Sequence, residues 1–348
     1  MIQGRSAIGV DLSKNVIHIH AADSRGSCLW RKKVRKEEFG IVLAQLPKGS
    51  KVYMEACGSA HYWSRKAESL GLKAHQISPQ FVKPFVKSQK NDYNDAEATL
   101  EAGSRASMRY VSTKSVGQQE LQAMHSVRSR RMAERIALMN QIRGILQEQG
   151  VTIWQGPSRL KKYLVGEFLT DTELSEGTRQ IVIAMKEELS ELERRIADID
   201  KQIVERARAC PMVKRLMTVP GIGVLTATAL AAACGNPKAF KNGRQFSAWL
   251  GLVPRQVSTG GKTTLLGISK RGDKYVRMLL VHGARSLVKV ALKKNDPHSL
   301  WIRKLHAAKG TNLTAVAVAN KNARIAWRIM TSNQEYDPAL PHVASTIQ

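Results

Sequence analysis

The chain has 348 residues, of which 43% are apolar, and a formal net charge of +27. This apolar content is enough for folded cores, so the composition excludes a largely disordered chain. Because so large a charge repels itself in the compact state, it predicts a polyanionic partner, and nucleic acid is the commonest one. The alternative is a ribosome-associated protein or a soluble protein that is merely basic.

The cysteines and apolar runs bear on the compartment. The four cysteines are far apart, at positions 28, 57, 210 and 234. This spacing argues against a zinc ribbon or a disulfide framework and favours a reducing compartment. No apolar stretch approaches the roughly 20 residues of a membrane span, and the N-terminus lacks a secretory apolar region. We therefore expect a cytoplasmic, nucleoid-associated protein with no membrane partner.

Residues 1–112 predict an α/β domain. Strands are predicted at 6–11, 15–21, 27–34, 51–54 and 72–77, and helices at 36–46, 60–70, 79–87 and 92–106. The segment NVIHIHA alternates as a half-buried strand does. Three strands in a meander, followed by alternating helices and strands, is the order expected of a ribonuclease-H-like fold.

Residues 113–210 predict two long helices, at 117–150 and 174–209. In the second helix, apolar residues recur at alternating spacings of three and four, which is typical of a coiled-coil seam. The seam residues are Val182, Met185, Leu189, Leu192, Ile196, Ile199 and Ile203. We expect a helical hairpin, either within one chain or shared between protomers. The first helix carries Arg128, Arg130, Arg131 and Arg135, which indicate either nucleic-acid backbone contact or a solvated face.

Residues 211–332 predict a third, mainly helical block, in which Asp273 and Asp296 are the only acids. Residues 333–348 lack periodicity and predict a loose tail. Within the block, PGIG before an alanine-rich helix is typical of a helix-hairpin-helix motif. Gly221 and Gly223 would let backbone amides approach a phosphate. The alternative is an ordinary tight turn between helices.

Four acids stand where the predicted fold would bring them together. Asp11 and Glu55 end strands, and Asp92 and Asp95 share one face at the start of a helix. Carboxylates at close range repel one another, and divalent cations remove that difficulty. The pattern therefore predicts a catalytic site for Mg²⁺ (or Mn²⁺). The alternative is that each acid is only a helix cap or turn residue.

The segment VSTGGK places the Ser258 hydroxyl beside two glycines and several cations. Those cations, which would offset charge on phosphoryl oxygens, are Arg255, Lys262, Lys270 and Arg271. A serine nucleophile needs a proton acceptor, and no neighbouring histidine or carboxylate obviously provides one. The spacing alone thus leaves open both a nucleophile and a phosphate-binding loop.

Several segments, taken together between residues 6 and 330, resemble one family. GVDLSKN, VYMEACG, KNDYNDAEA, PGIG, FSAWLGLVPRQVSTGGK and GISKRGDKYVRMLLVHGAR are similar to the DEDD-type insertion-sequence transposases of the IS-110 family, and STGGK to its IS-1111 branch. The resemblance implies a RuvC-like N-terminal domain whose metal-binding tetrad matches Asp11, Glu55, Asp92 and Asp95. It also implies that Ser258 attacks DNA to form a phosphoserine link. Thr259, where relatives often have serine, is the alternative nucleophile.

The resemblance also implies the partners. Relatives use a noncoding bridge RNA that pairs with donor and target DNA, and their dimers pair into tetramers in which the acids of one protomer meet the serine of another. We therefore expect a DNA transposase or recombinase. Two rivals are a RuvC-like, metal-dependent junction nuclease that forms no covalent link, and a non-enzymatic nucleic-acid-binding scaffold.

Overall fold

The computed structural model describes residues 7–23, 25–87, 91–171 and 174–338. Ser6, where the first strand was predicted to begin, lies outside the described residues, as do the last ten residues of the predicted tail. Within the described residues, no helix combines the length and apolar character needed to cross a bilayer.

The chain forms two compact units. Unit 1 comprises Met1–Gln118 with Cys234–Ala239, and unit 2 comprises Gln119–Ala233 with Phe240–Gln348. The late segment is anchored within unit 1, because Gln118 Nε2 donates a hydrogen bond to the Gly235 carbonyl at 3.2 Å. The four-part division predicted from the sequence stays a prediction.

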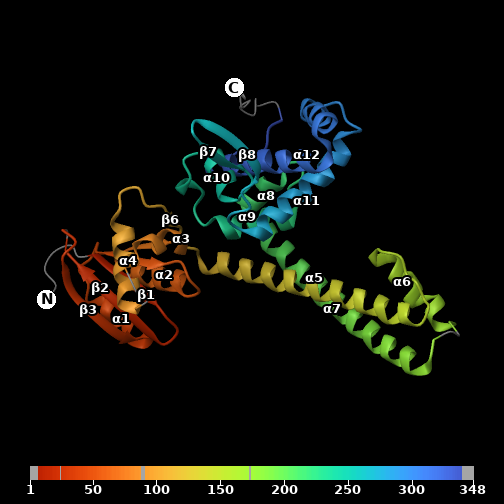
Figure 1. The fold of residues 1–348 in the computed structure, drawn as a ribbon, viewed down its shortest axis with the longest axis horizontal. Coiled ribbons are helices and arrows are strands. Elements are labelled where there is room, and N and C mark those ends of the chain that lie inside the picture. The colour runs from red at the N-terminus through yellow and green to blue at the C-terminus, as the bar shows by residue number, and fades with distance from the viewer. Residues whose placement is uncertain (1–6, 24, 88–90, 172–173, 339–348) are drawn as a thin grey trace. The chain divides into compact units, whose positions relative to one another are not determined.

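Unit 1 is built on a six-stranded mixed sheet with the order β3-β2-β1-β4-β5-β6 (Figure 1). β1, β2 and β3 form an antiparallel meander, β1, β4 and β5 run parallel, and β6 is antiparallel to β5. The strands are β1 (Ala7–Leu12), β2 (Val16–Ala22), β3 (Cys28–Arg35), β4 (Lys51–Glu55), β5 (Lys73–Ile77) and β6 (Tyr110–Val111). The predicted α/β start of the chain is confirmed, and β6 is an element that the sequence did not predict.

Helices cover both faces of this sheet. On one face, α1 (Lys36–Ala44) and α2 (Ala60–Ser69) bury Phe39 and Trp63 against Ile8 and Val10 of β1. On the other face lies α4 (Asp92–Ser104), preceded by α3 (Pro79–Val82) and η1 (Lys83–Phe85). Because successive side chains of a strand point to opposite faces, Asp11, Glu55 and the histidines of β2 all belong to the α4 face.

The covering by α4 corrects one expectation. The NVIHIHA strand was predicted to be half-buried, yet it is buried on both faces, with His18 6% and His20 4% exposed. The alternation therefore predicted the strand correctly, but the prediction that one face contacts solvent was wrong.

Two glycines let α4 lie close to the sheet. A Cβ atom at Gly9 of β1 would stand 2.2 Å from the Ala96 carbonyl oxygen, and one at Gly103 of α4 would stand 2.3 Å from the Tyr53 ring. Neither position has room for a side chain. This close contact fixes where the first turn of α4 meets the end of β1.

In unit 2, α5 (Val116–Glu148) and α7 (Glu176–Ala209) run side by side (Figure 1). The short α6 (Pro157–Val165) and η2 (Glu167–Leu169) connect them. Six of the seven predicted seam residues are buried and Met185 is partly buried; those nearest the connection pack on Leu138, Ile142 and Leu146 of α5. The apolar seam is therefore covered within the same chain.

The rest of unit 2 is mainly helical, as predicted, with one hairpin that was not predicted. In chain order, the elements after α7 are α8 (Pro211–Met217), α9 (Val224–Cys234), η3 (Pro237–Ala239), α10 (Gly243–Trp249), β7 (Pro254–Thr259), β8 (Lys262–Ile268), α11 (Lys274–Ala291) and α12 (Pro297–Ser332). Of these, η3 lies in the segment Cys234–Ala239, which belongs to unit 1. Gly260 and Gly261 join β7 to β8 with φ angles of 56° and 78°. Two consecutive positive φ angles are what a tight hairpin turn requires, and glycine accepts them without strain.

Candidate active site

The edge of the sheet where β1 and β4 end carries two of the predicted acids. Val10 of β1 is paired with Met54 of β4 in a parallel register, so the next residues, Asp11 and Glu55, end up side by side. Both point to the α4 face. The predicted convergence of strand-end acids follows directly from this register.

The first turn of α4 supplies the other two acids. Asn91 caps the helix by accepting a hydrogen bond from the Tyr93 amide at 3.0 Å, and Asp92 and Asp95 follow on one face. Carboxylates are favourable at a helix N-terminus because its amides carry partial positive charge. Asp11, Asp92 and Asp95 each offer a carboxylate oxygen within 4.8 Å of the others.

The negative charges of this cluster act on Glu55. Burial raises the pKa of the Glu55 carboxyl, and the negative charges of Asp11 and Asp95 raise that pKa further. Three carboxylates already crowd this edge, so full ionisation of all four acids is unfavourable without a cation. The donor set consists of hard oxygen atoms, which fits Mg²⁺ or Mn²⁺.

His18 adjoins the cluster and was not among the predicted site residues. It is paired across β1 and β2 with Asp11. Its Nδ1 atom lies 3.6 Å from Asp92 Oδ2, and its ring packs edge-on against Tyr93 with 4.8 Å between centroids. The sequence showed the histidine but not the register that places it beside the acids.

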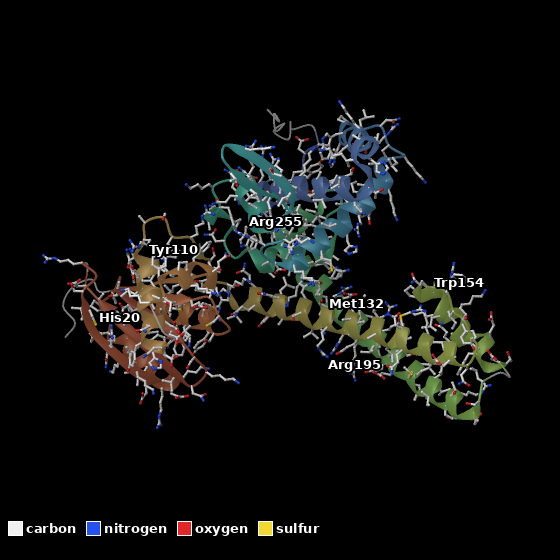
Figure 2. The ribbon with its side chains drawn as sticks, viewed as in Figure 1. His20, Tyr110, Met132, Trp154, Arg195 and Arg255 are labelled. Carbon is white, nitrogen blue, oxygen red and sulfur yellow. The ribbon has the colours of Figure 1, made fainter. Side chains whose placement is uncertain are left out.

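His20, labelled in Figure 2, occupies the same face of β2 but has other partners. Its Nδ1 accepts a hydrogen bond from Arg31 Nε at 3.2 Å. Arg31 and Lys87 also pair with Glu97 of α4, at 2.8 and 3.1 Å. These ion pairs link the sheet to α4 beside His20, two residues along β2 from His18.

Ser258 lies on the β7–β8 hairpin of unit 2, where every residue of β7 is exposed. Gln256 Nε2 donates a hydrogen bond to Ser258 Oγ at 2.9 Å, and Thr263 Oγ1, directly across the hairpin, lies 3.3 Å from the same oxygen. Neither contact was predicted. Among the described residues, no carboxylate or imidazole hydrogen-bonds to Ser258, so the proton acceptor missing from the sequence is missing here too.

The four predicted cations around the serine are all exposed, and none forms an ion pair within the described part of the chain. They are Arg255 (labelled in Figure 2), Lys262, Lys270 and Arg271.

The base of the hairpin is held by backbone contacts. A Cβ at Gly251 would stand 2.1 Å from the Arg271 carbonyl oxygen, and one at Gly272 would stand 2.0 Å from that of Trp249. Arg277 of α11 donates hydrogen bonds to the carbonyl oxygens of Leu250 and Arg271, at 3.0 and 2.8 Å. The exposed β7–β8 hairpin is therefore held at its base by close backbone packing and by the hydrogen bonds of Arg277.

The two glycines of the turn between α8 and α9 have different surroundings. At Gly221 a Cβ would meet the Gly283 carbonyl oxygen at 3.1 Å, and Asn322 donates a hydrogen bond to the Pro220 carbonyl at 2.9 Å. Gly223 is exposed and has no atom within 4 Å of a built Cβ. Packing accounts for Gly221, whereas Gly223 is open to solvent.

The predicted arginine cluster largely joins α5 to α7. Arg128 pairs with Asp200, Arg135 Nε donates to Glu193 Oε1 at 2.8 Å, and Arg131 donates to the Arg195 carbonyl at 3.0 Å. The fourth arginine, Arg130, is exposed and pairs with Glu134 on its own helix. Three of the four therefore have partners on the facing helix.

Comparison with known proteins identifies the class. A transposase family model of the DEDD type from IS110 matches residues 8–150, which contain all four acids. A second model, described as the transposase IS116/IS110/IS902 family, matches residues 213–298, which contain the hairpin. The protein is a transposase, an enzyme that acts on DNA. The DEDD family and the aspartate cluster together indicate dependence on a divalent metal.

Full-length relatives identify the family. The chain is similar to a probable family 20 transposase of Pseudomonas aeruginosa, with 45% identity over 96% of this chain and 99% of the relative. It is also similar to the transposase for insertion sequence element IS1111A of Coxiella burnetii, with 41% identity over 94% of this chain and 90% of the relative. The transposase for IS1328 of Yersinia enterocolitica is 39% identical over 93% of this chain and 96% of the relative. The chain belongs to the IS110 family of insertion-sequence transposases.

Proposed function

We propose that this transposase exchanges DNA strands through a phosphoserine intermediate formed by Ser258, with a divalent metal held by Asp11, Glu55, Asp92 and Asp95. The observation that carries this proposal is the meeting of Asp11, Asp92 and Asp95 within 4.8 Å at the end of β1, beside Glu55. A purely structural set of acids would gain nothing from such repulsion. We further propose that unit 1 has a RuvC-like fold.

The metal would be Mg²⁺ or Mn²⁺, which when bound supplies positive charge to phosphoryl oxygens. The four acids would hold it, and Gly9 and Gly103 keep α4 close enough to β1 for Asp92 and Asp95 to take part.

The serine step is a phosphoryl transfer. Ser258 Oγ forms a bond to a DNA phosphorus, the bond from that phosphorus to one deoxyribose oxygen breaks, and the Oγ proton passes to the departing oxygen through solvent. A hydroxyl of a second strand then attacks the phosphorus, the Oγ–phosphorus bond breaks, and the proton released by that hydroxyl passes through solvent to Ser258 Oγ. Gln256 and Thr263 orient Oγ, and the four exposed cations offset phosphate charge.

The nucleic-acid partners and the assembly are also proposals. A charge of +27 supports binding of donor DNA, target DNA and a guide RNA. For the backbone contacts we propose the hairpin cations and Gly223, the latter within a helix-hairpin-helix formed by α8 and α9. The exposed face of the α5–α7 pair, which we propose is a coiled coil, is a candidate contact for a homodimer that pairs into a tetramer.

The decisive experiment compares Ser258→Ala with Thr259→Ala, because both hydroxyls are exposed on the same strand. Recombination is measured in cells, and protein–DNA adducts are trapped on denaturing gels. We expect Ser258→Ala to abolish both recombination and adduct, and Thr259→Ala to retain both. Full activity of Ser258→Ala would refute the serine mechanism.

A companion variant tests the acids. Asp11→Asn should abolish recombination while DNA binding, followed by gel shift, persists. Metal-dependent cleavage without any adduct in the wild type would instead favour a junction nuclease, and unchanged recombination by Asp11→Asn would favour a scaffold in which the acids are structural.

A further inference from the structure

We propose that His18 is a positioning residue of the acidic site, where its Nδ1–H donates a hydrogen bond to Asp92 and holds that carboxylate toward Asp11 and Asp95. The inference rests on the metal site proposed above. It adds a residue of β2 to a site otherwise made by β1, β4 and α4.

The first observation is a buried nitrogen without a hydrogen-bond partner. His18 is 6% exposed, and its Nδ1 makes no hydrogen bond to any described residue. Buried polar atoms are nearly always hydrogen-bonded, so one without a partner calls for an explanation.

The second observation is where this nitrogen points. Asp92 Oδ2 lies 3.6 Å away, just beyond hydrogen-bond length. Of the three clustered aspartates, only Asp92 is exposed, with 58% of its side chain in solvent. A small rotation of this side chain closes the gap, and Asp92 is the ligand that most needs an orienting partner.

The third observation is that the imidazole is buried and packed while the Asp92 carboxylate is exposed. The backbone register sets His18 opposite Asp11, and the Tyr93 ring packs edge-on against the imidazole. A packed donor beside an exposed acceptor favours the acceptor rotamers that point toward the donor. Such supporting hydrogen bonds to metal ligands commonly change metal affinity by about 10- to 100-fold.

His20 provides a matched control. It lies on the same strand and face and is 4% exposed, but its Nδ1 already accepts a hydrogen bond from Arg31. A substitution there perturbs the same helix–sheet contact without touching the acid cluster.

The test measures binding of Mn²⁺ alone to the full chain, by calorimetry, for His18→Leu, His18→Asn and His20→Asn. Asparagine keeps an N–H donor near the Nδ1 position, whereas leucine removes it. We expect affinity to fall roughly tenfold or more in His18→Leu, and to stay within about threefold of wild type in the other two. Equal losses in His18→Leu and His18→Asn would overturn the proposal, because they indicate direct metal ligation or a packing role.

A double-mutant cycle guards against a folding defect. If His18 acts through Asp92, His18→Leu causes no further loss of Mn²⁺ affinity in an Asp92→Ala background. A further loss there overturns the proposal, and so does wild-type affinity in His18→Leu. Thermal unfolding without metal checks that each variant is folded.

The Asp11→Asn variant separates the proposal for His18 from the proposal for the metal site. If Asp11→Asn binds Mn²⁺ as the wild type does, the proposed metal site itself is wrong. If Asp11→Asn loses Mn²⁺ binding and only His18→Leu binds normally, the role of His18 alone is wrong.

Discussion

One face of the exposed β7–β8 hairpin carries Gln256, Ser258 and Thr263, whose side chains are hydrogen-bonded to one another. An exposed serine samples several rotamers, and each hydrogen bond to Oγ favours one of them. A fixed hydroxyl approaches a phosphorus in line more often than a free one does. In the proposed mechanism, Gln256 and Thr263 therefore affect the rate of serine attack more than they affect folding.

We predict that Gln256→Ala and Thr263→Val each slow adduct formation about fivefold, the value of roughly one net hydrogen bond. Thr264→Val is the matched control, because Thr264 is paired with Val257 and points to the opposite face. Adduct accumulation over time on denaturing gels measures the effect. The prediction fails if Thr264→Val is as slow as Thr263→Val.

Among the elements, α4 combines a structural and a chemical function. Its small residues let its backbone touch β1 at Gly9, and its first turn carries Asp92 and Asp95. The position of these proposed metal ligands is thus set by the packing of the helix. A displacement of the helix moves both carboxylates together.

We predict that Gly9→Ala lowers the free energy of unfolding by about 1–3 kcal/mol, because the obstructing atom is a backbone oxygen that cannot rotate away. Mn²⁺ affinity should fall as well. Gly40→Ala, in α1 with no atom near a built Cβ, should instead raise stability by about 0.5–1 kcal/mol. Urea unfolding compares the two; equal stability of both variants would contradict the close contact at Gly9.

The elements also show what the sequence can reveal. Alternation and strand-end acids predicted the strands β1, β2 and β4 and the meeting of Asp11 with Glu55. The β7–β8 hairpin was missed although VSTGGKTT carries its signal, a two-glycine turn between β-branched residues. β6 has two residues, so its pairing depends on tertiary contact rather than on local pattern.

Contacts between residues far apart in the chain could not be predicted from the sequence. The importance of His18 depends on its register with Asp11, and Arg128 and Arg135 find their acids on a helix more than fifty residues away. Periodicity carries no information about such pairings. The sequence therefore offered only nucleic-acid contact or a solvated face for these arginines, because it does not show that Asp200 and Glu193 lie opposite them.

At the scale of the whole molecule, some of the positive residues are paired with acids and others are not. The hairpin cations have no acidic partner in the described chain, whereas Arg128 and Arg135 are paired to α7. Only unpaired cations add fully to the release of counterions when DNA binds. The two groups should therefore respond differently to salt.

We predict that replacing both Arg255 and Lys262 with glutamine weakens binding to random-sequence duplex DNA and reduces the salt slope of log affinity by about 2. Arg135→Gln should lower the unfolding temperature and leave the slope unchanged. Fluorescence anisotropy at several salt concentrations measures both. If Arg135→Gln lowers the slope by about 1, this arginine contacts nucleic acid as the sequence first indicated.

The segment Cys234–Ala239 belongs to unit 1 although 115 residues of unit 2, 119–233, precede it. A ribosome makes the chain in order from its N-terminus. The sheet and its acids can thus emerge early, but the contact of Gly235 with Gln118 must wait until all of those residues have been synthesised. The unit that holds the acids is completed only after the long helices have left the ribosome.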